Sequence, residues 1–87
     1  GDLTFGIYPV PGKDIIYLRP GSDYMKEVVI KIADITGRIV LETKIEKLFR
    51  SVPCPIDISA LPDGSYHLSI SNKEMLHVER IVKMPEH

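Results

Sequence analysis

Residues 57–68, Asp-Ile-Ser-Ala-Leu-Pro-Asp-Gly-Ser-Tyr-His-Leu, form the stretch that most limits the fold of this chain. Ile56 and Ile58 close one expected strand, and the proline-led turn at residues 61–64 delivers the chain to Tyr66 at the start of the next. This arrangement is similar to a tyrosine corner, in which a tyrosine hydroxyl bonds back to the backbone of the preceding connection. The alternative is that Tyr66 is simply a core aromatic. Both interpretations predict that Tyr66 is buried.

Alternating apolar residues and turn residues predict short strands on both sides of this stretch. The expected ranges are Thr4–Tyr8, Asp14–Leu18, Val28–Ile35, Arg38–Ile45, Phe49–Val52, Pro55–Ile58, Ser65–Ser71 and Leu76–Lys83. The pattern permits either one strand or two over the ranges Phe49–Val52 and Pro55–Ile58. Ile45, Leu48 and Phe49 lie at helical spacing, but a single turn is shorter than a self-supporting helix. Strand spacing of about ten residues is typical of a sandwich or barrel.

Composition supports this interpretation. The chain has 87 residues, enough for one small domain and not for two. Ile and Val together number 19 against 9 for Leu and Ala, which favours strands over helices. No uninterrupted apolar run approaches the roughly 18 residues that a membrane span requires.

Charge and cysteine content limit the classes of partner. The net charge of −1 is spread along the chain without a basic block, which argues against nucleic acid. The single cysteine, Cys54, closes no intramolecular disulfide and is most simply a small apolar residue at a sheet edge. The segment Gly1–Phe5 has neither the positive nor the apolar region of a signal peptide, so an exported protein would carry its leader on a longer parent chain.

Two hairpins are predicted in detail. In Asp34-Ile35-Thr36-Gly37 the Asp and the Gly occupy the first and fourth positions of a type I turn, where Gly often makes a bulge. The register of that hairpin stays open, because the three residues 39–41 are all apolar. In the second hairpin a three-residue turn at 72–74 would set Ile70 opposite Leu76 and Leu68 opposite Val78, with both apolar sets facing inward.

The same register puts His67 opposite Glu79 on the outer face. His67, His77 and Glu79 are ordinary zinc ligands, but the simpler interpretation is a solvated cross-strand pair. The sequence contains no G-x-S-x-G motif, and it contains no glycine-rich loop leading into a helix. We therefore expect no catalytic site, no cofactor, no metal and no small-molecule substrate.

Four pieces of the chain together resemble a known family. They are Tyr8-Pro9-Val10-Pro11, Asp34-Ile35-Thr36-Gly37-Arg38-Ile39-Val40, the stretch Asp57–Leu68, and Arg80-Ile81-Val82-Lys83. In order and spacing they are similar to the C-terminal sorting domain of the type IX secretion system, over nearly the whole chain. Two departures are Val10, where the family usually has Asn, and the tail Met84–His87 beyond the final motif.

The resemblance implies an all-β, immunoglobulin-like Greek-key sandwich of about seven antiparallel strands, a single domain over 1–87 that ends a longer secreted chain. It implies export in Bacteroidota through the periplasm and across the outer membrane to the cell surface or the medium. A surface sortase then usually removes the domain and joins the cargo to a lipopolysaccharide anchor. The expected partners are translocon and sortase components, and the domain itself would not be an enzyme.

The resemblance also suggests roles for particular residues. We expect the machinery to contact the final strand, because an edge strand offers unpaired backbone groups; the residues concerned are Arg80, Ile81, Val82 and Lys83. The alternative for Arg80 and Lys83 is that their charges protect that edge. An exposed final strand would also permit edge-to-edge dimers. Scaffold roles fall to Tyr8, Pro9, Pro11, Asp34, Gly37, Arg38, Val40, Leu61, Gly64 and Tyr66.

The rival hypothesis is an immunoglobulin-like binding or spacer module of an extracellular protein, because fold alone does not fix function. Sugar binding would require exposed aromatic platforms. The chain has no Trp, and we expect most of its six aromatic residues to be needed in the core: Phe5, Tyr8, Tyr17, Tyr24, Phe49 and Tyr66. Protein binding by such a module stays open.

Overall fold

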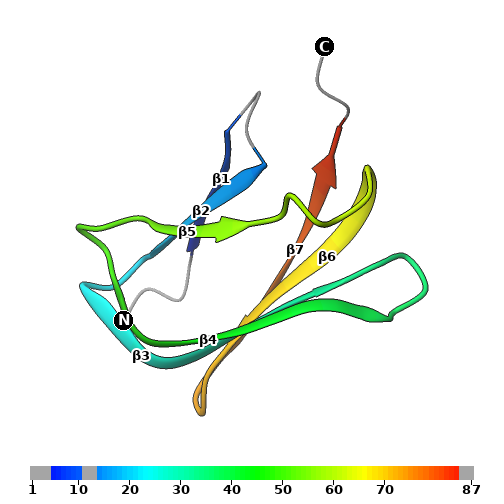
Figure 1. The fold of residues 1–87 in the computed structure, drawn as a ribbon. Helices are drawn as coiled ribbons and strands as arrows, with labels where there is room; N and C mark the ends of the chain where they lie inside the picture. The colour runs from blue at the N-terminus through cyan, green and yellow to red at the C-terminus, as the bar shows by residue number, and fades with distance from the viewer. Residues whose placement is uncertain (1–4, 11–13, 85–87) are drawn as a thin grey trace.

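Seven antiparallel strands form two sheets in the computed structural model, which describes residues 5–10 and 14–84 (Figure 1). The strands are β1 (Phe5–Pro9), β2 (Ile15–Pro20), β3 (Tyr24–Ala33), β4 (Ile39–Phe49), β5 (Cys54–Asp57), β6 (Gly64–Ser71) and β7 (Leu76–Lys83). One sheet has the order β1-β2-β5 and the other β4-β3-β6-β7. The predicted all-β class is confirmed, and an immunoglobulin-like sandwich is consistent with this topology.

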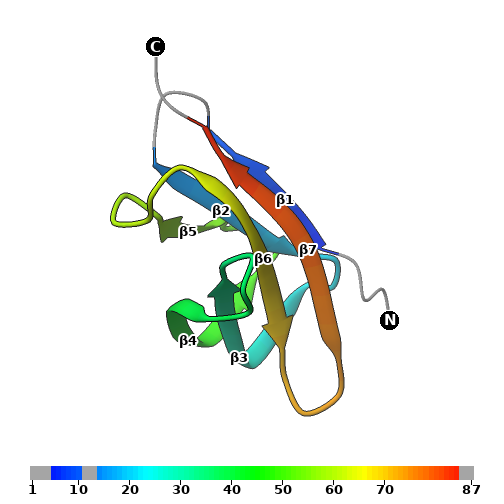
Figure 2. The same cartoon turned by 90° about the vertical axis from the view of Figure 1, so that its right-hand side faces the viewer.

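The core lies between the two sheets, which stand apart in Figure 1 and overlap in the turned view of Figure 2. Its buried apolar residues come from both sheets and from the connection before β6: Ile16, Leu18, Val28, Ile30, Ile32, Leu48, Ile56, Ile58, Leu61, Tyr66, Leu68 and Ile70. Within β2, β3 and β6 these residues recur at every second position, because alternate side chains of a strand point to the same face. The alternation along each of these strands therefore determines which of its side chains face solvent.

The β3–β4 hairpin is longer than predicted at its open end. Alternation breaks there, since Lys26 and Glu27 in β3 are both exposed, as are Glu46 and Lys47 in β4. Glu27 adopts a left-handed backbone (φ 56°), which changes the phase of the side chains while the strands stay paired on both sides. Ile45 and Leu48 therefore both face inward at helical spacing without any helix.

The predicted strand Phe49–Val52 is wrong. Phe49 ends β4, and the Val52 amide donates to the Phe49 carbonyl oxygen at 3.3 Å, closing a turn. Both side chains are exposed, so these apolar residues do not mark a buried strand. The strand predicted at Pro55–Ile58 is present as β5.

The turn after β3 is confirmed as a turn with a bulge. The Gly37 amide donates to the Asp34 carbonyl oxygen at 3.0 Å, and Gly37 has a φ of 88°. The pairing then shifts by one residue between Ile32 and Ala33, which leaves one extra residue in β4. Because of this bulge Val40 and its neighbour Leu41 both pack against the core, which settles the register that the sequence left open.

The predicted register of the β6–β7 hairpin is wrong by one residue. The turn contains four residues, 72–75, because the Asn72 side-chain oxygen accepts hydrogen bonds from the Glu74 and Met75 amides at 2.8 and 3.0 Å. Ser71 therefore pairs with Leu76 at the end of the hairpin. A shift of one residue turns every side chain to the other face, so the even-numbered residues of β7 face outward.

Candidate functional site

The final strand β7 is an edge of the four-stranded sheet, and among the described residues it pairs only with β6. The four residues predicted to contact the secretion machinery point alternately to opposite faces of β7. Arg80 and Val82 point outward and are exposed, whereas Ile81 and Lys83 lie on the inner face and are half-buried. The four residues therefore form no single contact surface.

Lys83 is held by the connection between β5 and β6. Its ammonium donates to the carbonyl oxygens of Ile58 at 3.1 Å, Ser59 at 3.3 Å and Leu61 at 2.6 Å. An ammonium has three donors, so the three carbonyls use its full capacity. The carboxylate of Asp14 lies 3.8 Å away, and only 11% of the Lys83 side chain is exposed.

The segment that Lys83 holds is also closed locally. The Asp57 carboxylate accepts a hydrogen bond from the Ser59 amide at 2.8 Å, and the Leu61 amide donates to the Ile58 carbonyl oxygen at 3.0 Å. The backbone hydrogen bond from Ser59 lowers the pKa of Asp57, and the charge of Lys83 adds a smaller lowering. Side-chain and backbone bonds thus present the three carbonyl oxygens to one cation.

Tyr66 forms a tyrosine corner, the first of the two alternatives that the sequence leaves open. Its hydroxyl donates to the Pro62 carbonyl oxygen, and the side chain is 5% exposed. Gly64 between them has a φ of 150°, a backbone conformation that L side chains rarely adopt. Leu61 is buried in the core. The residues of this motif are therefore bound to one another, while residues 62–64 of the turn stay exposed.

The Asp34 turn is a second closed unit. Asp34 Oδ1 accepts hydrogen bonds from the Thr36 hydroxyl at 2.6 Å, the Thr36 amide at 2.9 Å and the Arg38 amide at 3.1 Å. The hydroxyl bond is the largest cause of a lowered pKa of Asp34. The Arg38 side chain is exposed, so it is free to contact solvent or a partner.

The first motif lies on the other sheet. Tyr8 pairs with Tyr17 and Pro9 with Ile16, and Tyr8 is 52% exposed. The Tyr8 ring lies across Gly6, where a Cβ would clash with it. Pro11 falls outside the described residues.

The three zinc-ligand candidates do not meet. His67 faces outward opposite Arg80, and not opposite Glu79 as predicted. His77 and Glu79 are on the inner face, with 3.6 Å between His77 Nε2 and Glu79 Oε1, and the His77 ring contacts Phe5 of β1. The described part of the chain contains no group of three residues that could hold a metal ion.

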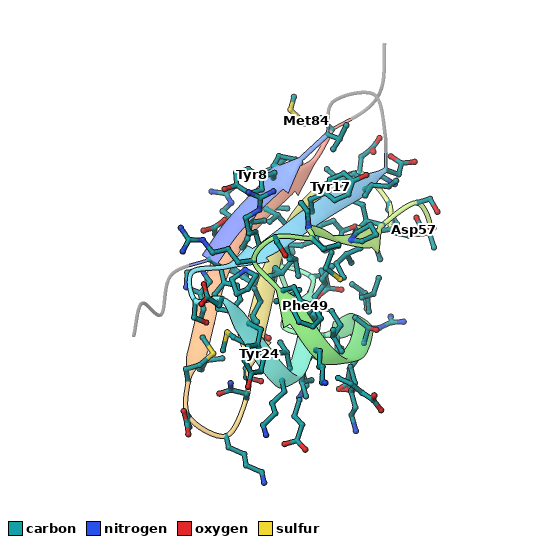
Figure 3. The ribbon with its side chains drawn as sticks, turned by 90° about the vertical axis from the view of Figure 1, so that its left-hand side faces the viewer. Tyr8, Tyr17, Tyr24, Phe49, Asp57 and Met84 are labelled. Carbon is teal, nitrogen blue, oxygen red and sulfur yellow. The ribbon has the colours of Figure 1, made fainter. Side chains whose placement is uncertain are left out.

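An exposed apolar row on β7 is the feature that sequence reasoning missed. Its members are Leu76 (69% exposed), Val78 (54%), Val82 (52%) and, just after the strand, Met84 (74%). Met84 projects away from the sheet in Figure 3. The alternation of these residues was visible in the sequence, but the expected register placed Leu76 and Val78 in the core. The only signal against that register was Asn72, which can close a turn with its own side chain.

The expectation that most aromatic residues fill the core is also wrong. Of the six, Tyr66 alone is buried, and Tyr8, Tyr24 and Phe49 are exposed. Tyr24 and Phe49 are cross-strand partners whose rings lie 6.2 Å apart (Figure 3). The core is filled instead by Ile, Leu and Val, and so aromatic residues are left at the surface.

Cys54 lies in the edge strand β5 and packs against the core, as predicted for a small apolar residue. Burial raises the pKa of its thiol. No helix in the described ranges is long and apolar enough to cross a membrane.

Comparison with protein families gives a match. The model of the secretion system C-terminal sorting domain matches residues 6–84, nearly the whole chain. A search of curated proteins finds no match.

Proposed function

Because the chain belongs to the family of type IX secretion C-terminal sorting domains, we propose that its folded surface and its final strand together form the signal that the secretion machinery reads. Membership of the family identifies the domain as a sorting signal for export through the outer membrane. Sorting domains are tags without catalysis of their own. The chain would therefore act as an address for a cargo on its N-terminal side.

The observation that supports recognition at the final strand is the open edge of β7. An edge strand can pair with a strand of another protein through main-chain hydrogen bonds. Arg80 and Val82 stand exposed beside that edge and would contact the partner directly. Ile81, packed against the core, and Lys83, bound to three carbonyls, would hold the strand in place.

The partners and the later steps follow the family's usual course. The cargo would reach the periplasm by an ordinary leader, and translocon components would recognise the domain there. A sortase at the cell surface would then remove it and join the cargo to a lipopolysaccharide anchor. An exposed β7 edge would also permit edge-to-edge dimers at high concentration.

A reporter fusion tests the proposal. The chain is placed behind a leader and a fluorescent protein in a bacterium with the type IX system, and surface fluorescence is compared among four forms: intact, truncated from Arg80 onward, Val82→Lys and Val52→Lys. Val52 is the matched control, because it is also an exposed valine (63%) but lies in the turn before β5. Export by the intact and Val52→Lys forms is expected, with loss in the other two.

Two outcomes would contradict the proposal. Retention of the intact fusion in the periplasm would exclude the sorting role in that host. Normal export of both the truncated form and Val82→Lys would exclude the final strand as the site of recognition. Because truncation also removes Lys83, the point substitution separates recognition from folding.

The alternative is an immunoglobulin-like binding or spacer module. The exposed Tyr24–Phe49 pair supports this alternative, since paired aromatic rings can stack on a ligand. The position in the parent gene distinguishes the two hypotheses. A sorting domain must lie at the extreme C-terminus behind a larger cargo, whereas a spacer can lie anywhere.

A further inference from the structure

We infer that the partner of β7 is a protein strand that adds to its open edge and presents, on the outer face, apolar residues and one acidic residue opposite Arg80. This inference rests on the proposed recognition at β7 and adds the chemistry of the partner. It follows from the observed register of the β6–β7 hairpin, which decides which side chains border the open edge.

The apolar row of β7, defined above, gives the first part of the pattern. Outward positions of an edge strand are normally polar, because apolar side chains there promote association with other chains. In β7 three of the four outward positions are Leu or Val, each more than half exposed. A strand paired with β7 would place its own side chains about 5 Å from this row and remove it from water.

The neighbouring strand β6 does not cover the row. The residues opposite Leu76, Val78 and Val82 are all serines: Ser71, Ser69 and Ser65. Serine is too small to shield a leucine or valine beside it. The row is therefore uncovered on the β6 side. On its other side no described strand pairs with β7, and an added strand would lie directly beside the row.

Arg80 supplies the charged part of the pattern. It lies in the middle of the row, and its guanidinium donates to the hydroxyl of Ser65 at 3.1 Å. No carboxylate among the described residues pairs with it; Glu79 points to the other face, and the Lys31–Glu42 pair lies beyond β6. An acidic residue opposite Arg80 in the partner would complete a cross-strand ion pair.

A second copy of this chain fits the edge less well. Two β7 strands related by a two-fold axis keep their outer faces together only if the axis passes through one residue, which then faces its own copy. The two such overlaps that pair the most residues of β7 place Glu79 against Glu79 or Arg80 against Arg80. Like charges directly opposite are destabilising. Overlaps centred on Val78 or Ile81 avoid this contact but pair fewer residues of β7, so a different protein, which has neither restriction, fits the edge better.

Synthetic peptides test the pattern directly. In antiparallel pairing the complementary sequence is Val-Thr-Glu-Thr-Val-Thr-Ile, in which Glu faces Arg80; the reversed peptide serves for parallel pairing. Each peptide is compared with its Glu→Lys form by NMR titration of the isotope-labelled domain. One orientation of the Glu peptide should shift the β7 amides and bind about threefold more tightly than its Lys form. In the Arg80→Glu variant the preference should reverse.

The inference is overturned if neither Glu peptide shifts the β7 amides, if the shifts occur at β1, β4 or β5 instead, or if Arg80→Glu leaves the preference unchanged. It is also overturned if β7 shifts depend only on the concentration of the domain, which would show that a second copy occupies the edge. Failure of the peptides with loss of export in Val82→Lys would reject the pattern and leave the sorting role intact. Failure of export by the intact fusion would instead reject the role.

Discussion

The ammonium of Lys83 in the final strand donates a hydrogen bond to the carbonyl oxygen of Leu61 at 2.6 Å. The two residues are 22 positions apart, and the bond joins β7 to the connection that enters β6. Together with the tyrosine corner, this bond joins the motif Asp57–Leu68 to the motif Arg80–Lys83 in one unit. Much of what these two motifs specify is therefore internal structure.

Lys83→Met should destabilise the domain by about 2 kcal/mol, because it removes the charged donor that serves three carbonyl oxygens and keeps the apolar stem. Urea unfolding measures the change. The control is Lys73→Met at the exposed turn between β6 and β7, which should leave the midpoint unchanged. Equal midpoints for the two variants would show that the carbonyl contacts add nothing to stability.

Tyr66→Phe should cost about 1 kcal/mol, because only the hydroxyl that donates to Pro62 is lost. For a domain of this size the melting temperature should fall by about 4–8 °C. Tyr66→Ala should cost about 3 kcal/mol or more, since it also leaves a cavity in the core. Tyr24→Phe, at an exposed tyrosine, is the control, and a Tyr66→Phe melting curve that overlays it would contradict the tyrosine corner.

Gly37→Ala should destabilise the domain by about 1 kcal/mol. No atom lies within 4 Å of the added Cβ, so the cost comes only from the backbone, whose φ is 88°. Gly37→Asn should cost less, because Asn tolerates the left-handed conformation. Thermal unfolding of both variants checks this order, and an Ala variant as stable as the parent would show that the turn does not need glycine.

The stability of the domain should fall as the pH drops below about 4, in part through Asp34. Hydrogen bonds, first that from the Thr36 hydroxyl, lower the pKa of Asp34 in the folded state. A lowered pKa contributes stability that is present above the unfolded value of about 3.9 and is lost as the pH falls through the folded value. Asp34→Asn should therefore reduce the difference in urea midpoint between pH 6 and pH 3, to use rough end points on either side of that range.

The control for this pH effect is Asp63→Asn. Asp63 is exposed, and its carboxylate accepts no hydrogen bond from the described residues. This variant should keep the full acid dependence of the parent. If the dependence of stability on pH is reduced equally in both variants, the loss of one negative charge, and not the Asp34 turn, causes the effect.

The sequence predicts features that depend on neighbouring residues and misses those that depend on distant ones. The turn at Asp34–Gly37 is predicted, and the corner at Tyr66 is one of two alternatives that the sequence offers, because their partners lie within four residues. The full length of β3 is not predicted, because the residue pattern gives no signal for the left-handed backbone of Glu27. The internal role of Lys83 was missed for the same reason, since its partners are 22 to 25 residues away and lysine is normally exposed.

The observed register of β7 predicts that Val78→Lys changes stability by less than about 0.5 kcal/mol, because the side chain already faces water. In the register expected from the sequence, Val78 would lie beside Leu68 in the core, and lysine there would be strongly destabilising. Leu68→Ala, at a fully buried position, is the positive control and should cost about 2–5 kcal/mol. A second readout is the backbone contact across the hairpin, which NMR should detect between Ile70 and His77. A contact between Ile70 and Leu76 instead, with a destabilised Val78→Lys, would restore the three-residue turn and return the apolar row to the core.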